Sequence, residues 1–180
     1  DANEADTFNA ELKHLLVTQK AAFNSPVWFN IGVKGVPQQA SACFILSVDD
    51  SMDSILNWYR EEGVIFKGGS GAGVNLSRIR SSVELLKGGG TASGPVSFMD
   101  VWDGMCRTIM SAGARRGAMM ATLRCDHPDI EAFVDAKSDP GRLRNFNLSV
   151  LVTDAFIAAV RSDAPWDLVF EGMVYRTVQA

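Results

Sequence analysis

Short apolar segments that suit β-strands alternate along this chain with segments whose apolar residues recur at helical spacing. The segment at residues 41–48 predicts a buried strand, and the helix after it begins near Met52 and ends near Gly63. Later strands are predicted at residues 74–80, 118–123 and 146–152, and later helices begin at Pro95, at Pro128 and at Thr153 or Asp154. Repeated β–α units predict an α/β fold, with a largely parallel sheet covered by helices and ligands at the carboxyl ends of strands.

The two ends of the chain depart from this alternation. Residues 7–23 predict an amphipathic helix, and residues 25–32 predict a packed loop because a proline and two aromatic residues occur there without alternation. We therefore expect an N-terminal helical segment at residues 1–24 and the α/β domain at residues 25–180. The chain begins with Asp and ends in an apparently helical run, so we expect it to be a fragment of a longer protein.

The charge distribution indicates a small anion site. The net charge of −4 disfavours a protein that coats nucleic acid, and the longest uncharged stretch, residues 35–48, is too short to cross a membrane. Residues 67–124, however, carry eight Lys and Arg against three Asp and Glu. This local excess of positive charge predicts that the segment binds an anionic ligand.

The cysteines and histidines do not form a metal-binding pattern. Cys43, Cys106 and Cys125 are widely spaced without a C-x-x-C motif, and only His14 and His127 accompany them. We predict no metal site and no disulfide scaffold, and the reducing cytoplasm is the expected compartment. Taken alone, each cysteine is best interpreted as a small buried apolar residue, and the histidines as a surface residue and a helix-capping residue.

Glycine is concentrated in two loops, KGGSGAG at residues 67–73 and KGGGTASG at residues 87–94. Such loops either bind phosphate through main-chain N–H groups or form tight structural turns, and the spacing leaves both interpretations open. The first loop matches neither a Walker A motif nor a dinucleotide motif, and it is one glycine short of a nucleophile elbow. Arg115 and Arg116 lie in a third loop, which is either a solvated turn or a clamp for a phosphate or base.

Taken together, these segments resemble the catalytic chain of ribonucleotide reductase, most closely the adenosylcobalamin-dependent (class II) type. The motifs that carry the resemblance are SPVWFN (25–30), SACFILSVDDSMDSI (41–55), FKGGSGAGVNLSRIR (66–80), GGGTASGPVSFMDVWD (88–103), ARRGAMMATLRCDHPDIEAFVDAK (114–137) and NFNLSVLVTDAF (145–156). The resemblance implies that this chain is the opening portion of a ten-stranded α/β barrel.

The resemblance also implies a chemistry. A thiyl radical removes the ribose 3′ hydrogen, the 2′ hydroxyl leaves as water, and a pair of cysteines supplies the electrons. Cys43 matches the first cysteine of that reducing pair, and a thiol is needed there because it can be left as a disulfide after reducing the substrate. The radical cysteine and the second reducing cysteine are expected in a later part of the family's chain.

Three groups of site residues carry over by their positions in the motifs. Ser25, Ala42, Cys43 and Gly71 match residues that line the substrate ribose and diphosphate. The residues that match the binding site of an allosteric deoxynucleoside triphosphate are Asp50, Ser51, Met52, Lys67 and Arg80. The specificity loop between effector and substrate base is expected around Ser111, Arg115 and Arg116.

The resemblance implies adenosylcobalamin as the cofactor, a ribonucleotide substrate, a deoxynucleotide effector, a thioredoxin-like dithiol reductant and a possible homodimer. It implies no membrane or nucleic-acid partner. One alternative is the large subunit of a diiron-dependent (class I) ribonucleotide reductase, with the same fold and no cobalamin. Another is a noncatalytic nucleotide-binding module, since the chain has effector-like residues but lacks the radical cysteine. As a separate polypeptide the chain is expected to be inactive.

Overall fold

The structure is a computed structural model that describes residues 2–35, 38–68, 70–109 and 118–180. The chain divides into two compact units, residues 1–42 and 43–180. The first unit contains helices α1 (Ala2–Val17) and α2 (Ser25–Asn30). The prediction of a packed loop at residues 25–32 is therefore wrong for the first six of these residues, which form α2. Pro26 is compatible with α2 because proline fits the first turn of a helix, where its missing N–H has no partner to lose.

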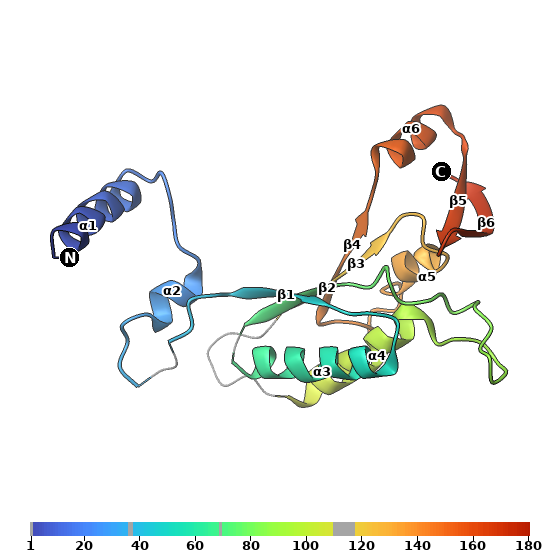
Figure 1. Ribbon diagram of the computed structural model, residues 1–180, viewed down its shortest axis with the longest axis horizontal. Helices are drawn as coiled ribbons and strands as arrows, with labels where there is room; N and C mark the ends of the chain where they lie inside the picture. Colours follow the sequence, from blue (N-terminus) through green and yellow to red (C-terminus); the bar gives the residue numbers. More distant parts are fainter. Residues whose placement is uncertain (1, 36–37, 69, 110–117) are drawn as a thin grey trace. The chain divides into compact units, whose positions relative to one another are not determined.

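The second unit is built on a four-stranded parallel sheet (Figure 1). Its strands are β1 (Cys43–Ser47), β2 (Gly71–Asn75), β3 (Met119–Arg124) and β4 (Phe146–Leu151), which pair in the order β1-β2-β3-β4. The connecting helices are α3 (Met52–Lys67), α4 (Gly94–Thr108) and α5 (Ile130–Asp135). The alternating pattern in the sequence thus predicted the fold correctly, and the sheet fits the opening of an α/β barrel.

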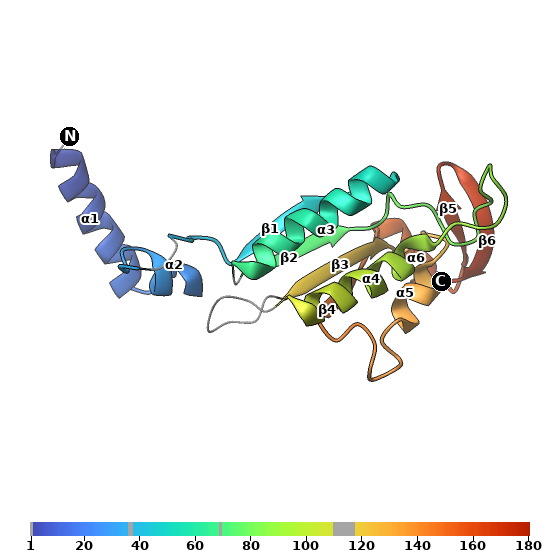
Figure 2. The same cartoon turned by 90° about the horizontal axis from the view of Figure 1, so that it is seen from below.

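Helices α3 and α4 lie side by side on one face of the sheet (Figure 2). The core forms between them and the sheet: Trp58, Tyr59 and Trp102 pack together, with the rings of Tyr59 and Trp102 stacked 5.7 Å apart. On β3, Met119 and Ala121 point into this core, whereas Met120 is exposed on the opposite face. The helices therefore bury one face of the sheet, and the described residues of the second unit leave the other face uncovered.

The prediction that strand β1 is buried is wrong. It lies at the edge of the sheet, where Cys43 and Ser47 are exposed and Ile45 is 93% exposed. Only the alternate residues Phe44 and Leu46 are partly buried. The continuous apolar run predicted burial on both faces, but helices cover only one.

Strand β2 begins three residues earlier than predicted, inside the first glycine-rich loop. A Cβ atom on Gly71 would lie 2.5 Å from the carbonyl oxygen of Ala118, so only glycine fits this pairing of β2 with the start of β3. Three of the seven residues of the first glycine-rich loop are therefore strand, and Gly71 allows close approach of the neighbouring backbone.

The chain ends differently from the expected helical run. After α6 (Asp154–Ser162), an antiparallel hairpin forms from β5 (Pro165–Phe170) and β6 (Met173–Gln179). Its turn residues Glu171 and Gly172 both have positive φ, the conformation that favours a two-residue hairpin turn. No helix in the described part of the chain is long and apolar enough to cross a membrane.

Candidate functional site

A pocket lies where β1 and β2 end and α3 and α4 begin. It encloses about 210 Å³ and is lined by Asp50, Ser51, Met52, Ile55, Arg80, Leu86, Ala92, Ser93, Gly94 and Phe98. Four of the five predicted effector-binding residues are among them. The pocket is at the carboxyl ends of parallel strands, the position at which α/β folds bind ligands.

The amino termini of two long helices meet at this pocket. Helix α3 begins at Met52 after the N-cap Ser51, whose hydroxyl accepts a hydrogen bond from the main-chain N–H of Ser54 (3.2 Å). Helix α4 begins at Gly94, which also lines the pocket. The first N–H groups of a helix have no partner within it, and the helix dipole adds positive potential at this end. Two such termini favour an anionic or oxygen-rich ligand.

Arg80 supplies the cationic side chain of the pocket. Its Nε donates to Asp50 Oδ2 (2.6 Å), and its main-chain N–H donates to Asp50 Oδ1 (3.1 Å). Hydrogen bonding to Asp50 raises the pKa of Arg80, so the guanidinium stays charged. Because a guanidinium has five N–H donors and this pair uses one, the others can bind a phosphate.

The opposite wall of the pocket is apolar. Ile55 is on α3, Phe98 is on α4, and Leu86 comes from the second glycine-rich loop region. Tyr59 fixes the two helices together by donating to the carbonyl oxygen of Phe98 (2.8 Å). A ligand with an anionic part and a flat apolar part, such as a nucleotide, matches the two walls.

The structure does not bring the remaining predicted effector residue to the pocket. Lys67 is the last residue of α3, roughly 22 Å from Met52 along the helix axis at about 1.5 Å per residue. Its role in effector binding therefore stays a prediction.

Two of the predicted substrate residues, Cys43 and Gly71, are at the other end of the sheet. Cys43 and Gly71 are paired neighbours that begin β1 and β2, and the Cys43 side chain is exposed. Ser25 begins α2, and Ala42 directly precedes β1; both belong to the first unit. The structure thus places Cys43 beside Gly71, and the contribution of the other two stays a prediction.

The predicted specificity loop, with Ser111, Arg115 and Arg116, lies outside the described residues. Its role stays a prediction.

Ion pairs with acids from outside the basic segment reduce its excess of positive charge in the folded structure. Three arginines of the basic segment pair with acids that flank it: Arg78 with Asp49 (2.7 Å), Arg80 with Asp50 (2.6 Å) and Arg124 with Asp126 (2.7 Å). The first of these pairs is largely exposed and therefore weak. Arg80 is itself paired with Asp50, so the potential at the pocket comes from the helix termini and from the Arg80 N–H groups that this pair does not use, more than from the total charge of the segment.

Cys106, Cys125 and His127 are buried, which agrees with the interpretation of the two cysteines as small apolar residues. Burial, together with Glu62 and Asp103, raises the pKa of the Cys106 thiol to about 12, and burial raises the pKa of Cys125. Neither is a thiolate at neutral pH. His127 accepts from the main-chain N–H of Asp129 just before α5 (3.1 Å), so it is a buried capping residue.

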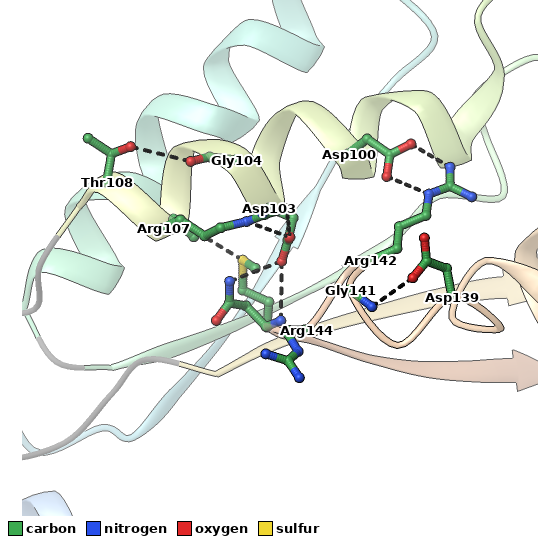
Figure 3. A network of polar contacts seen from close by, with 12 residues as sticks. Asp100, Asp103, Gly104, Arg107, Thr108, Asp139, Gly141, Arg142 and Arg144 are labelled. Atoms are coloured by element: carbon green, nitrogen blue, oxygen red, sulfur yellow. Dashed lines mark hydrogen bonds and ion pairs between the residues drawn. The ribbon is translucent and has the colours of Figure 1, made fainter.

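A polar network fixes α4 to the loop before β4 (Figure 3). Buried Asp103 accepts from the main-chain N–H of Asn145 (3.2 Å) and from Arg107 (2.8 Å). Asp100, which lies on α4 about one turn before Asp103, forms an ion pair with Arg142 in the loop before β4. These contacts hold the helix whose first residue lines the pocket.

Sequence reasoning missed half of the pocket lining, the five residues that come from residues 86–98: Leu86, Ala92, Ser93, Gly94 and Phe98. The signal was present in the Gly-Pro start of a helix after a glycine-rich loop, which places a helix terminus beside that loop. Within the described residues there is no group of three or more His, Cys, Asp or Glu side chains that could hold a metal ion.

Comparison with known proteins identifies the family. Residues 41–178 match the model of the ribonucleotide reductase barrel domain. The chain belongs to the ribonucleotide reductase family. It is 53% identical to the vitamin B12-dependent ribonucleotide reductase of Streptomyces clavuligerus, over 92% of this chain and 20% of that protein. It is also 42% identical to the vitamin B12-dependent ribonucleoside-diphosphate reductase of Thermoplasma acidophilum, over 81% of this chain and 19% of that protein.

The chain spans about a fifth of the length of these curated relatives. In an α/β barrel the helices form the outer ring and the other face of the sheet lines the interior. The uncovered face of this ribonucleotide reductase sheet carries Cys43 and Ile45. Family membership thus explains why an apolar strand is exposed here, since this face belongs to the inside of a barrel.

Proposed function

We propose that the parent protein reduces ribonucleotides, preferably diphosphates, to 2′-deoxyribonucleotides by thiyl-radical chemistry, and that this chain contributes its first reducing cysteine. The observation that carries the proposal is the position of Cys43, exposed beside Gly71 on the face of the sheet that a barrel turns inward. The names of the relatives, vitamin B12-dependent ribonucleotide reductase, support it.

The proposed role of Cys43 accounts for the electrons of the reaction. Cys43 and a second cysteine outside this chain are oxidised from two thiols to one disulfide. The two electrons and two protons that they release break the C2′–O bond, form a C2′–H bond and release the hydroxyl as water. A thioredoxin-like dithiol then reduces the disulfide by thiol exchange, which requires an accessible sulfur.

The test is anaerobic reduction of a labelled ribonucleoside diphosphate by the full-length protein with a dithiol, with and without adenosylcobalamin. We expect Cys43→Ser to abolish multiple turnover while nucleotide binding stays near normal. Ser47→Ala, which removes an exposed side chain from the same face of β1, is the matched control and should retain turnover. Sustained turnover by Cys43→Ser would refute the assignment.

The proposed cofactor of the parent protein is adenosylcobalamin, on the basis of the relatives' names. The described residues of this chain do not form a site for it: His127 is buried with both ring nitrogens hydrogen-bonded, and His14 lies exposed on α1 beside Lys20. If activity requires a separate diiron subunit instead of cobalamin, the fold assignment stands and the proposed cofactor is wrong. Nucleotide binding without any reduction would support a noncatalytic module.

We propose that the pocket between α3 and α4 binds the deoxynucleoside triphosphate effector. The two helix termini and Arg80 suit the phosphates, and the apolar wall suits the base. In equilibrium binding of labelled dTTP to the full-length protein, Arg80→Ala should weaken affinity by about tenfold, since it removes a charge-assisted phosphate contact. Arg78→Ala, two residues away and outside the pocket, is the control and should bind normally.

The size of the pocket supports a homodimer. About 210 Å³ is small beside the roughly 300–1,000 Å³ typical of ligand pockets, so a second copy could complete the site. Met52, Leu56 and Val64 are exposed on α3, on the helix that borders the pocket. We propose that this surface faces the second copy. We also propose that the protein works in the reducing cytoplasm. Leu56→Glu should then lower the mass measured by light scattering, whereas an unchanged mass would place the interface elsewhere.

A further inference from the structure

A buried carboxylate lies behind the pocket. Asp129, directly before α5, is only 6% exposed. Its Oδ1 accepts hydrogen bonds from the hydroxyls of Ser81 and Ser82 (both 2.8 Å), and its Oδ2 accepts from the main-chain N–H of Ser82 (2.8 Å). These two serines directly follow Arg80, so one side chain fixes the segment that carries the cation of the pocket.

His127 fixes the same segment on the other side of Arg80. Its Nδ1 accepts from the main-chain N–H of Asp129 (3.1 Å), so Nε2 carries the proton and donates to the carbonyl oxygen of Ile79 (2.9 Å). Burial lowers the pKa of His127 and keeps this neutral form at physiological pH. The main chain is thus held at Ile79, immediately before Arg80, and at Ser82, just after it.

Asp129 also packs against Gly94, a residue that lines the pocket. A Cβ atom on Gly94 would lie 2.7 Å from Asp129 Oδ2 and 2.7 Å from the Cβ of Ser82. The first residue of α4 therefore packs directly on Asp129 and on the serine that it binds. One carboxylate sets the distance between the Arg80 segment and the terminus of α4.

We propose that Asp129 is a positioning residue for nucleotide binding, acting with His127 to place Arg80 and the start of α4 against the same phosphate-bearing ligand. The proposal rests on the proposed effector role of the pocket. Asp129 does not line the pocket itself, so its effect on the ligand passes through Arg80 and Gly94.

The test is binding of labelled dTTP to the full-length protein carrying Asp129→Ala, Asp129→Asn or Arg80→Ala. Asp129→Ala should weaken binding by about tenfold, because Ser82 N–H loses its acceptor and the segment is released. Asp129→Asn keeps one carbonyl oxygen for that N–H and should restore part of the affinity. Asp135→Asn, which changes an exposed carboxylate on α5, is the matched control and should bind like the wild type.

The double variant Arg80→Ala/Asp129→Ala separates positioning from general destabilisation. Because part of the effect of Asp129 passes through Arg80, the loss in the double variant should fall clearly short of the product of the two single losses, whereas independent effects would multiply to about a hundredfold. Multiplied losses, or normal binding by Asp129→Ala, would overturn the proposal. Normal binding by Arg80→Ala would instead overturn the effector role of the pocket. If Asp129→Ala does not fold, His127→Gln and Asp129→Asn provide the same comparison.

Discussion

Glu62 is buried between α3 and α4, and its charge should control how firmly these helices pack. Its side chain is 1% exposed. Among the described residues, neither carboxylate oxygen has a hydrogen-bond partner of normal geometry, and neither do the indole nitrogens of Trp58 and Trp102. Burial raises the pKa of Glu62 from its ordinary 4.5 to about 7, although the two indole N–H groups oppose the shift in part. The folded state therefore binds a proton at Glu62 more tightly than the unfolded state does.

The sign and size of the effect follow from this pKa. Because the folded-state value lies above the unfolded one, Glu62 contributes its full stability below pH 4.5 and loses it as the pH rises through about 7. At about 1.4 kcal/mol for each pH unit between the two values, the loss is about 3 kcal/mol. The titratable neighbours are Tyr59 and Cys106, whose pKa values burial and Glu62 raise, and Asp103, which pairs with Arg107. Neither the phenol nor the Cys106 thiol titrates over this range.

Hydrogen exchange measures this loss locally in the full-length protein. Amide protection in α3 and α4, corrected for intrinsic exchange, should fall by on the order of 100-fold between about pH 5 and pH 8 in the wild type. Glu62→Gln is neutral at every pH and should keep its protection. Glu61→Gln is the control, since Glu61 is next along α3 and accepts from Asn57 (2.9 Å); it should behave like the wild type. Equal pH dependence in wild type and Glu62→Gln would refute the reasoning.

Three further predictions, one of them with a control substitution, test other parts of the chain. Gly71→Ala should destabilise the sheet by about 1–3 kcal/mol, because its Cβ would meet the Ala118 carbonyl oxygen at 2.5 Å. Gly73→Ala, whose Cβ would have contacts no closer than 3.7 Å, should destabilise it less. Thermal unfolding compares the two variants. Gly104→Ala, in the interior of α4 with no atom within 4 Å of the new Cβ, should stabilise the protein by about 1 kcal/mol in the same assay. Arg116→Ala should blur effector-controlled choice among the four ribonucleotides more than it lowers the best rate, and unchanged selectivity in a competition assay would contradict the loop assignment.

The alternation of strands and helices and the parallel sheet could be predicted because each β–α unit has a local signal. The strand at Met119–Arg124 and the helix beginning beside Pro95 follow from apolar spacing and helix-start residues within a few positions. The helix at Ser25–Asn30 was missed because six residues are too few to show a helical period. The hairpin after α6 was missed because its signal is one short turn at Glu171 and Gly172.

The candidate site could be predicted only in part, because its contacts join distant segments. Asp50 and Arg80 were identified by their motifs, but their direct ion pair joins residues 30 positions apart. The net charge of the basic segment overstated its positive potential, since acids outside the segment pair with the arginines inside it. The role proposed for Asp129 depends on hydrogen bonds that span 47 and 48 residues, which no local pattern reveals.

The pairing order β1-β2-β3-β4 has a consequence for synthesis on the ribosome. Each strand pairs with the strand next along the chain, so a partner for every new strand has already emerged when that strand appears. Because chains emerge at about 5–20 residues per second, the sheet can grow one β–α unit at a time. A glycine at position 71 then matters early, since it determines whether the third strand of the nascent sheet can dock on the second.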